Sequence, residues 1–343
     1  MFDAGGRYEA LAVLTAFAVA WAAQRMFLVS ALSTRLLDYP NQRSLHQRPT
    51  PRTGGIALLL GIAAGWVWLP WALWVMPLAA ATLALAVVSF VDDLRGLSAR
   101  LRLAAHCGVC AAFAFAMGLD WVWVLALLLP LAWGVNLYNF MDGLDGLAAG
   151  AAVLGFGAYA LTAALHGGGA IAMLSACVAA AALGFLPSNF APARAFLGDV
   201  GSIPLGFLAG GIGIAGWRDG LWPLAFPVIV FAPLVADASV TLARRALRGA
   251  RLSEAHREHY YQRLALLGFG HRNAALLEYA LMLASGGIGV FCAGREGVPQ
   301  FLALLVLAAL LGAYFLAIDR AWSRTAARDK DGSGEFQQQG PQR

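Results

Sequence analysis

The sequence has little charge, and its cysteines do not form the pattern of a secreted or zinc-binding protein. Of its 343 residues, 13% are Asp, Glu, Lys or Arg, whereas a soluble domain typically carries about 25%. The four cysteines, Cys107, Cys110, Cys177 and Cys292, all fall in apolar stretches. There, packing is expected rather than a disulfide framework or a soluble zinc site. These shortages argue against a water-soluble globular fold, and nothing in the chain indicates a nucleic-acid partner.

Long hydrophobic runs make up most of the chain. Hydrophobic residues account for 60% of the sequence, and the runs approach the ~20 residues that a helix needs to cross a hydrocarbon core. We therefore predict an all-α polytopic integral membrane protein with about eleven transmembrane helices. The predicted spans are residues 11–32, 54–69, 71–91, 103–119, 121–137, 147–165, 170–186, 201–217, 221–243, 274–293 and 298–318.

The basic residues indicate how the bundle is oriented. Lys and Arg are retained on the cytoplasmic side during insertion, and nearly all of them follow the first, third, seventh and ninth predicted spans or lie in the tail. The opposite loops carry only Arg7, Arg218 and Arg295. We therefore predict a periplasmic N-terminus and a cytoplasmic C-terminus.

We expect one transmembrane domain over residues 1–318. The predicted cytoplasmic loops of this domain are residues 33–53, 92–102, 138–146, 187–200 and 244–273. Residues 319–343 are polar, and their last part is rich in Gly and Gln with little to bury. A disordered cytoplasmic tail is predicted there.

Five acidic residues gather on the predicted cytoplasmic side: Asp92, Asp93, Asp142, Asp145 and Asp199. Asp145 and Asp199 precede helical stretches, so helix capping is an alternative explanation for each of them. Capping does not explain Asp92 and Asp93, because a carboxylate at a helix C-terminus meets the negative end of the helix dipole. A divalent cation would relieve that cost, and Mg²⁺ binds one or two carboxylates together with phosphate oxygens and water.

Basic side chains surround this acidic centre in the predicted cytoplasmic loops. His46, Arg48 and Arg52 precede the second span, and His256 and His259 lie in a polar loop where neither helix packing nor topology requires histidine. Cationic side chains bind phosphate oxygens while a metal ion bridges them, as in phosphoryl-transfer sites. The combination indicates a phosphate-bearing substrate.

Other polar residues near the spans have simpler explanations. Arg244, Arg245 and Arg248 directly follow the ninth span, where topology or lipid headgroup binding accounts for them. His106 is expected to be an ordinary packed residue within the fourth span. Asp237 lies inside the ninth span and either approaches the site or pairs with a neighbouring helix.

Five motifs together resemble the polyprenyl-phosphate N-acetylhexosamine-1-phosphate transferase family, which includes the muramoyl-pentapeptide and GlcNAc-1-phosphate transferases. The resemblance covers residues 40–263, and it depends on the order, spacing and common sidedness of the motifs. The motifs are HQRPTPRTGG (46–55), FVDD (90–93), NLYNFMDGLDGLA (136–148), FLGDVGS (196–202) and HREH (256–259).

The resemblance implies a UDP-N-acetylhexosamine donor, undecaprenyl phosphate as acceptor, and Mg²⁺ as the metal, with Mn²⁺ as an alternative. It also implies a location in the bacterial inner membrane with the active site facing the cytoplasm, and it leaves a homodimer open. The catalytic pair would be Asp92 and Asp93. The metal ligands would be Asp199, Asp93 and Asp142, and the substrate-binding residues would be Asn139, Asp142, Asp145, His256, His259, Arg257, His46, Arg48 and Arg52.

One motif departs from the family pattern. Many relatives have a denser histidine cluster where this chain has HREH followed by Tyr260, Tyr261, Gln262 and Arg263. In this it resembles the bacterial branch that initiates O-antigen synthesis, where a 6-deoxy N-acetylhexosamine is a candidate sugar. The loop around residues 244–272 is where we expect the sugar to be recognised.

A secondary transporter is the alternative from a different functional class. Carboxylates and histidines inside a helix bundle can relay protons or bind ions. A transporter should place such residues near the bilayer midplane, whereas nearly all of them here are predicted in loops at one interface. A lipid-binding scaffold without activity is a second alternative, and the retained acidic residues argue against it.

Overall fold

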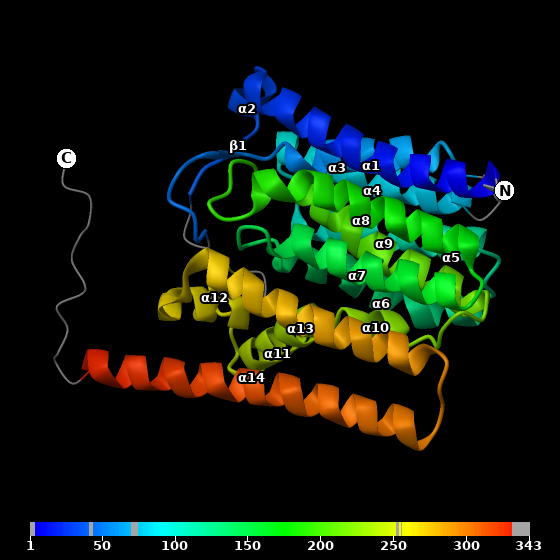
Figure 1. Cartoon of the computed structure of the whole chain (residues 1–343). Coiled ribbons are helices and arrows are strands. Elements are labelled where there is room, and N and C mark those ends of the chain that lie inside the picture. Colours follow the sequence, from blue (N-terminus) through cyan, green and yellow to red (C-terminus); the bar gives the residue numbers. More distant parts are fainter. Residues whose placement is uncertain (1–3, 41–43, 70–74, 252–253, 255, 331–343) are drawn as a thin grey trace.

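The computed structural model describes residues 4–40, 44–69, 75–251, 254 and 256–330, and the described chain is almost entirely helical (Figure 1). The elements in chain order are α1 (Ala4–Val29), α2 (Leu32–Arg35), β1 (Leu37–Asp38), β2 (Thr50–Pro51), α3 (Gly54–Trp66), α4 (Val75–Arg95), α5 (Ala99–Ala116), α6 (Trp121–Phe140), α7 (Leu147–Leu165), α8 (Gly169–Asn189), α9 (Asp199–Arg218), α10 (Phe226–Val230), α11 (Ala232–Leu247), α12 (Tyr260–Leu264), η1 (Ala265–Phe269), α13 (Gly270–Ala293) and α14 (Val298–Lys330).

Within the described residues, nine helices are long and apolar enough to cross a membrane. The prediction of an all-α polytopic membrane protein is therefore confirmed. Two of the eleven predicted spans have a different form. The predicted span 54–69 contains α3, whose 13 residues extend for only ~20 Å, less than the ~30 Å of a hydrocarbon core. The predicted span 221–243 contains α10 and the first part of α11, which are separated at Phe231. Pro233, a residue without a backbone N–H, follows two positions later.

The predicted disordered tail is wrong for residues 319–330, because α14 continues to Lys330. This helix has 33 residues and is ~50 Å long, whereas a hydrocarbon core requires only ~30 Å of helix. Its second part therefore projects beyond the end of the bundle, as Figure 1 shows. The remaining residues, 331–343, lie outside the described residues.

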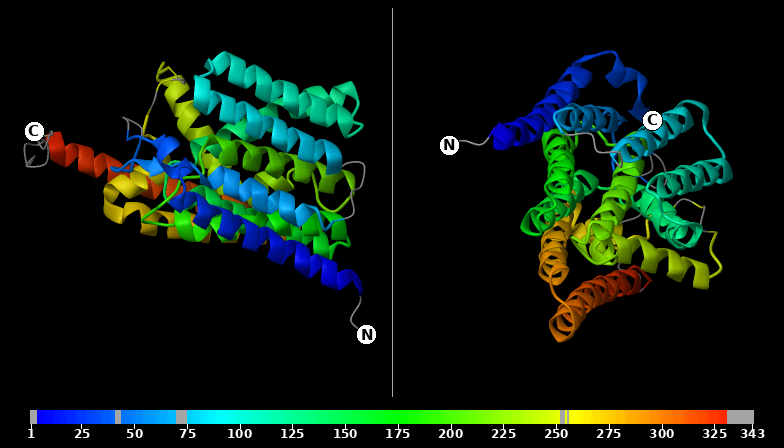
Figure 2. Two further views of the ribbon diagram at one scale, coloured as in Figure 1. Left: turned by 90° about the horizontal axis from the view of Figure 1, so that it is seen from above. Right: turned by 90° about the vertical axis from the view of Figure 1, so that its right-hand side faces the viewer.

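The helices surround α9, which is the most enclosed of the candidate spans and contacts α3, α4, α6, α7, α8 and α10. The end-on view in Figure 2 shows this arrangement, with α1 and α14 on the periphery. Small residues allow the close contacts. A Cβ atom added at Gly206 of α9 would lie 2.5 Å from the carbonyl oxygen of Gly134 in α6.

One end of the bundle collects the polar connections: β1, β2, the α6–α7 loop, the α8–α9 loop and α12 (Figure 1). We call it the polar end. The helix α1 begins at the opposite end, and α14 finishes at the polar end, as an odd number of crossings requires.

The segment that leads into α3 is attached to the segment that leads into α9. The strands β1 and β2 pair in antiparallel fashion, and the backbone N–H of Phe196 then donates to the carbonyl of Pro51 at 2.8 Å. Gly54 and Gly55 donate in turn to the carbonyls of Phe196 and Leu197 at 3.0 and 2.9 Å. Two loops about 140 residues apart in sequence are thereby held side by side at the polar end.

This attachment requires glycine where α3 meets α9. A Cβ atom added at Gly55 would lie 2.4 Å from the backbone nitrogen of Gly201. We predict that Gly55→Ala lowers the unfolding temperature of the purified protein, because overpacking typically costs about 1–3 kcal/mol. The matched control is Gly157→Ala in α7, where a Cβ atom would have no neighbour within 4 Å. Equal unfolding temperatures for the two variants, measured by a thermal scan in detergent, would contradict the proposed contact.

Candidate active site

Two arginines balance the acidic pair at the end of α4. Asp92 accepts a hydrogen bond from the backbone N–H of Leu97 at 2.6 Å and one from Arg102 Nη1 at 2.8 Å. Asp93 accepts a hydrogen bond from Arg52 Nη1 at 3.2 Å. The unfavourable position of two carboxylates at a helix C-terminus is therefore compensated by protein groups. Arginines thus supply part of the compensation that a divalent cation was expected to give, and a metal ion at this pair stays a prediction.

Arg52 joins three parts of the polar end. Its Nη2 donates to Asp38 Oδ1 at 2.5 Å while its Nη1 contacts Asp93. The Arg52 side chain packs against Gly198, whose φ is +67°. A Cβ atom added at Gly198 would lie 3.3 Å from Arg52 Cβ. Burial alone would lower the pKa of Arg52, but Asp38 and then Asp93 and Asp199 raise it. The guanidinium group is thus held in its charged form among carboxylates.

Asp142 and Asp199 approach this cluster from the α6–α7 loop and from the start of α9. Asp142 Oδ2 accepts a hydrogen bond from the backbone N–H of Gly198, next to Asp199, at 3.2 Å. Burial raises the pKa of the Asp142 carboxyl well above its usual range, and the negative charge of Asp199 raises it further. Arg102 Nη1 lies 4.0 Å from Asp199 Oδ2, so the same arginine faces both Asp92 and Asp199.

Two further predicted residues hold the surrounding loops in place. Asn139 Oδ1 accepts a hydrogen bond from the Ser202 hydroxyl at 3.0 Å, which joins α6 to α9. Asp145 accepts a hydrogen bond from the backbone N–H of Ala193 at 3.0 Å, and its other oxygen lies 3.0 Å from His271 Nδ1 in α13. Asp145 therefore connects three elements, and in this structure it does not act as the N-cap of α7.

The two histidines of the HREH motif lie together at the start of α12. Their ring centroids are 5.0 Å apart. His259 is 4% exposed and stacks between Phe140 and Tyr261, whereas His256 is only half-buried. The Tyr261 hydroxyl donates to the carbonyl of Phe140 at 3.0 Å, so this cluster packs directly against the loop that carries Asp142.

Asp237 of α11 determines how His259 is oriented. Its carboxylate is 1% exposed and lies 3.1 Å from His259 Nδ1. The carboxylate also accepts hydrogen bonds from the backbone N–H groups of Tyr260 and Tyr261, both at 3.0 Å, and from the Thr241 hydroxyl at 3.0 Å. Because all these groups donate to a carboxylate, Asp237 fixes the start of α12 and places the ring proton of His259 on Nδ1. Of the two alternatives left open for Asp237, the structure shows pairing with a neighbouring helix, the start of α12, through which Asp237 contacts His259.

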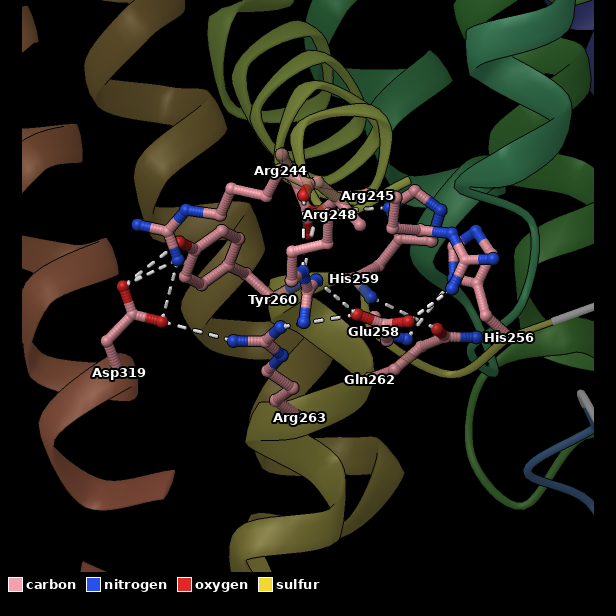
Figure 3. Close-up of polar contacts among 12 residues, drawn as sticks. Arg244, Arg245, Arg248, His256, Glu258, His259, Tyr260, Gln262, Arg263 and Asp319 are labelled. Atoms are coloured by element: carbon pink, nitrogen blue, oxygen red, sulfur yellow. Dashed lines mark hydrogen bonds and ion pairs between the residues drawn. The ribbon is translucent and has the colours of Figure 1, made fainter. Parts of the chain in front are cut away.

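Glu258 and Asp319 pair with the arginines around α12 (Figure 3). Glu258 forms ion pairs with Arg245 and Arg248, and Asp319 of α14 forms them with Arg244 and Arg263. Arg244, Arg245 and Arg248 were expected to serve topology or lipid headgroups. The structure shows that they also join α11, α12 and α14.

The remaining predicted residues are less central. The His46 ring packs edge-on against Phe196 with centroids 4.7 Å apart, and its Nε2 lies 3.9 Å from Asp38 Oδ2. Arg48 is exposed, and Arg257 is half-buried beside His256. His106 is buried, as expected. Residues 41–43, 252–253 and 255 of the predicted loops lie outside the described residues.

Sequence reasoning missed three members of the site. Asp38 precedes the HQRPTPRTGG motif by eight residues, Arg102 was counted only for topology, and Asp237 was left undecided. Arg102 follows Asp92 by ten residues, a spacing that has meaning only once α5 is known to turn back beside α4. An acidic residue inside an apolar span was the available signal for Asp237.

The acidic cluster can provide oxygen ligands for a metal ion. Within the described part of the chain, no three His, Cys, Asp or Glu side chains form a ready metal-binding group. Mg²⁺ does not need such a group, because it usually binds one or two carboxylates together with substrate phosphates. Burial and then the negative charge of Asp199 raise the pKa of both Asp93 and Asp142, so a cation beside these carboxyl groups would stabilise their ionised forms.

Comparison with known proteins shows the family of the chain. The model of glycosyl transferase family 4 matches residues 75–217. This range includes the acidic motif at the end of α4, the acidic motif of the α6–α7 loop, and the start of α9 with Asp199. The chain is 31% identical to a decaprenyl-phosphate N-acetylglucosaminephosphotransferase of Mycobacterium leprae, over 80% of this chain and 81% of that protein.

Two other relatives carry related names. A probable undecaprenyl-phosphate N-acetylglucosaminyl 1-phosphate transferase of Bacillus subtilis is 29% identical over 73% of this chain and 75% of its own length. A phospho-N-acetylmuramoyl-pentapeptide-transferase of Geobacillus thermodenitrificans is 29% identical over 72% of this chain and 85% of its own length. The chain therefore belongs to glycosyl transferase family 4, the polyprenyl-phosphate sugar-1-phosphate transferases that its motifs resemble.

Proposed function

We propose that the protein transfers an N-acetylhexosamine 1-phosphate from a UDP-sugar to undecaprenyl phosphate, releasing UMP and forming an undecaprenyl-diphosphate sugar. The observation that carries the proposal is the convergence at the polar end of carboxylates from α4, the α6–α7 loop and α9 with Arg52 and Arg102. Such a cluster suits two substrates that both bear phosphate, because cations and oriented donors stabilise charge spread over phosphate oxygens.

The acceptor does not need a base. A phosphate monoester has a second pKa of about 6, so it is mostly a dianion at pH 7. An oxygen of the acceptor phosphate attacks the sugar-bearing phosphorus of the donor, and the bond from that phosphorus to the bridging oxygen of UMP breaks. Catalysis then comes from positioning and charge stabilisation rather than from proton transfer.

Their carboxylate partners orient Arg52 and Arg102 for phosphate binding. A guanidinium group has five N–H donors. Arg52 uses two of its donors on Asp38 and Asp93, and Arg102 uses Nη1 on Asp92. The remaining N–H groups can bind phosphate oxygens while the side chains stay fixed. Asp92 is thus a positioning residue for Arg102 in this mechanism.

Asp199 and Asp142, with Asp93 beside them, would hold Mg²⁺ when it is bound, and the ion would neutralise the phosphate oxygens of the donor. The buried carboxyl of Asp142 next to the charge of Asp199 fits an oxygen-binding divalent cation. His256, His259 and Arg257 would face the donor diphosphate from the start of α12, with His259 oriented by Asp237.

The proposal also specifies the donor sugar and the side of the membrane on which the site lies. We take N-acetylglucosamine as the first donor sugar to test, because the names of two relatives contain it, and a 6-deoxy N-acetylhexosamine for O-antigen initiation as the next. The concentration of arginines in the loops of the polar end favours a cytoplasmic site in the inner membrane. The polar cluster at one end argues against a midplane transport site.

We predict that Asp93→Asn and Asp199→Asn each reduce UMP release by about 100-fold or more, the usual effect of removing one stabilising group. The assay uses purified protein, undecaprenyl phosphate, Mg²⁺ and a panel of UDP-N-acetylhexosamines, with loss of activity in EDTA and recovery on adding Mg²⁺.

The matched control for this experiment is Asp120→Asn at the opposite end of the bundle. Asp120 caps α6 through the N–H groups of Val122 and Trp123, and asparagine caps about equally well, so both activity and stability should be retained. Full activity in folded Asp93→Asn and Asp199→Asn would refute the proposal, and a trapped phosphoaspartate on Asp93 would refute direct attack.

A second prediction concerns the support of His259. Asp237→Asn presents an amide NH₂ to a site where four groups donate, so at least one of these groups loses its acceptor. We expect kcat/KM for the UDP-sugar to fall about 10–100-fold, as is typical for partners behind a binding histidine. His259→Gln combined with Asp237→Asn should add little to either single change. Additive losses, or an equal loss in Thr241→Val, would show that Asp237 does not act through His259.

The third prediction is a pH dependence at His256. Burial, then the charges of His259 and Arg245, lower the pKa of His256 to about 4, and its Nδ1 accepts the N–H of Glu258 at 3.3 Å. The unfolded chain, with an ordinary histidine pKa of about 6.5, therefore binds more protons between pH 6.5 and 4. Stability should fall as the pH drops through this window.

The measurement for His256 is the unfolding temperature between pH 7 and pH 4.5. We expect His256→Gln to lose less stability than the unaltered protein over this range, because glutamine does not titrate. The exposed change Arg324→Gln is the control. Identical pH profiles for the His256 variant and the unaltered protein would contradict a depressed pKa.

A further inference from the structure

A shallow cavity of about 480 Å³ opens at the polar end between α11, α12 and α14. It lies on the α14 side of the cluster in Figure 3, where Arg244, Arg263 and Asp319 face one another. Its lining residues are Arg244, Leu247, Arg248, Arg263 and Trp322. Three arginines, one aliphatic side chain and one tryptophan thus share one opening.

The charges around this cavity are not balanced. Asp319 pairs with Arg244 at 2.8 Å and with Arg263 at 3.1 Å. Glu258 pairs with the buried Arg245 and, at 2.6 Å, with Arg248. Four guanidinium groups therefore share two carboxylates. The cluster retains a positive charge that an anion would neutralise, and the Arg248 side chain is 59% exposed at the rim.

The position of the cavity points to the bilayer surface. Arg244 and Asp319 directly follow the apolar stretches 221–243 and 298–318, so the cavity lies where the hydrocarbon core ends. Leu247, beside the arginines, is 88% exposed, and Trp322 is 36% exposed. Tryptophan is enriched at headgroup depth, and an exposed leucine there gives an acyl chain an apolar contact.

We propose that this cavity is a binding site for an anionic phospholipid. The lipid phosphate lies against Arg248 and Arg244, and its acyl chain passes Leu247 and Trp322. Basic pockets between membrane helices bind anionic headgroups in this way. A free phosphate ion would use only the arginines, so the two exposed apolar side chains favour a lipid. The site is separate from the acidic cluster and does not depend on the transfer reaction.

The test compares the binding of phosphatidylglycerol and phosphatidylcholine, with the same acyl chains, to the full-length protein in detergent by native mass spectrometry. The informative variant is Arg248→Glu, whose exposed position and the remaining Arg245–Glu258 pair should leave the fold intact. The matched control is Arg324→Glu, which makes the same charge change on an exposed part of α14 outside the cavity lining.

We expect the unaltered protein and Arg324→Glu to bind phosphatidylglycerol at least about tenfold more tightly than phosphatidylcholine, since basic residues near a membrane surface attract anionic headgroups. Arg248→Glu should lose this preference. Leu247→Ser should weaken phosphatidylglycerol binding without changing the charge.

Three outcomes would overturn the proposal. They are equal binding of the two lipids, an equal loss in Arg324→Glu, and displacement of the lipid by inorganic phosphate at the same concentration. Equal binding of the two lipids would show that the site has no preference for an anionic headgroup. An equal loss in Arg324→Glu would show that binding depends only on the overall surface charge. Displacement by inorganic phosphate would show that the ligand is a free anion.

Discussion

The pairing of arginines with carboxylates is the constraint on which the polar end depends. Asp38, Asp92, Asp93, Asp142 and Asp199 come from four different segments, and their mutual repulsion in a partly buried setting would drive those segments apart. Arg52 and Arg102 lie between them, and each faces two carboxylates. Five carboxylates can therefore be concentrated at one place, and in the proposed function the same arginines act as oriented cations for the substrate phosphates.

A second layer of contacts holds α12 and the HREH segment before it against this cluster. Asp237 fixes the start of α12, and Tyr261 attaches that helix to Phe140 in the chain that leads to Asp142. The helix α14 adds a third contact, because Asp319 at the end of its apolar stretch pairs with Arg244 and Arg263. The break at Phe231 separates α10 from α11, and Asp237 on α11 bonds to the start of α12. Figure 2 shows how the ribbon of α11 leans away from the neighbouring helices.

Much of the fold and part of the site could be predicted because the signals are local. Apolar runs give the spans, and Asp92, Asp93, Asp142 and Asp199 stand out as acids at one interface. The partners of these acids could not be predicted, because Arg52 reaches Asp93 across 41 positions and Asp142 reaches Gly198 across 56. The helical end of α14 was missed because a polar composition resembles disorder when the anchoring pairs of Asp319 are unknown.

The sequence by itself determined that the chain crosses a membrane, which end is polar, and which residue types for phosphate chemistry gather there. Hydrophobic length and charge placement are properties of the linear chain, and they act during insertion before tertiary contacts exist. Only the tertiary structure decided that Asp92 holds Arg102, that Asp237 holds His259, and that four arginines around α12 share two carboxylates. These pairings arise from helix packing, because a side chain acquires a partner only when separate helices are brought within hydrogen-bond distance.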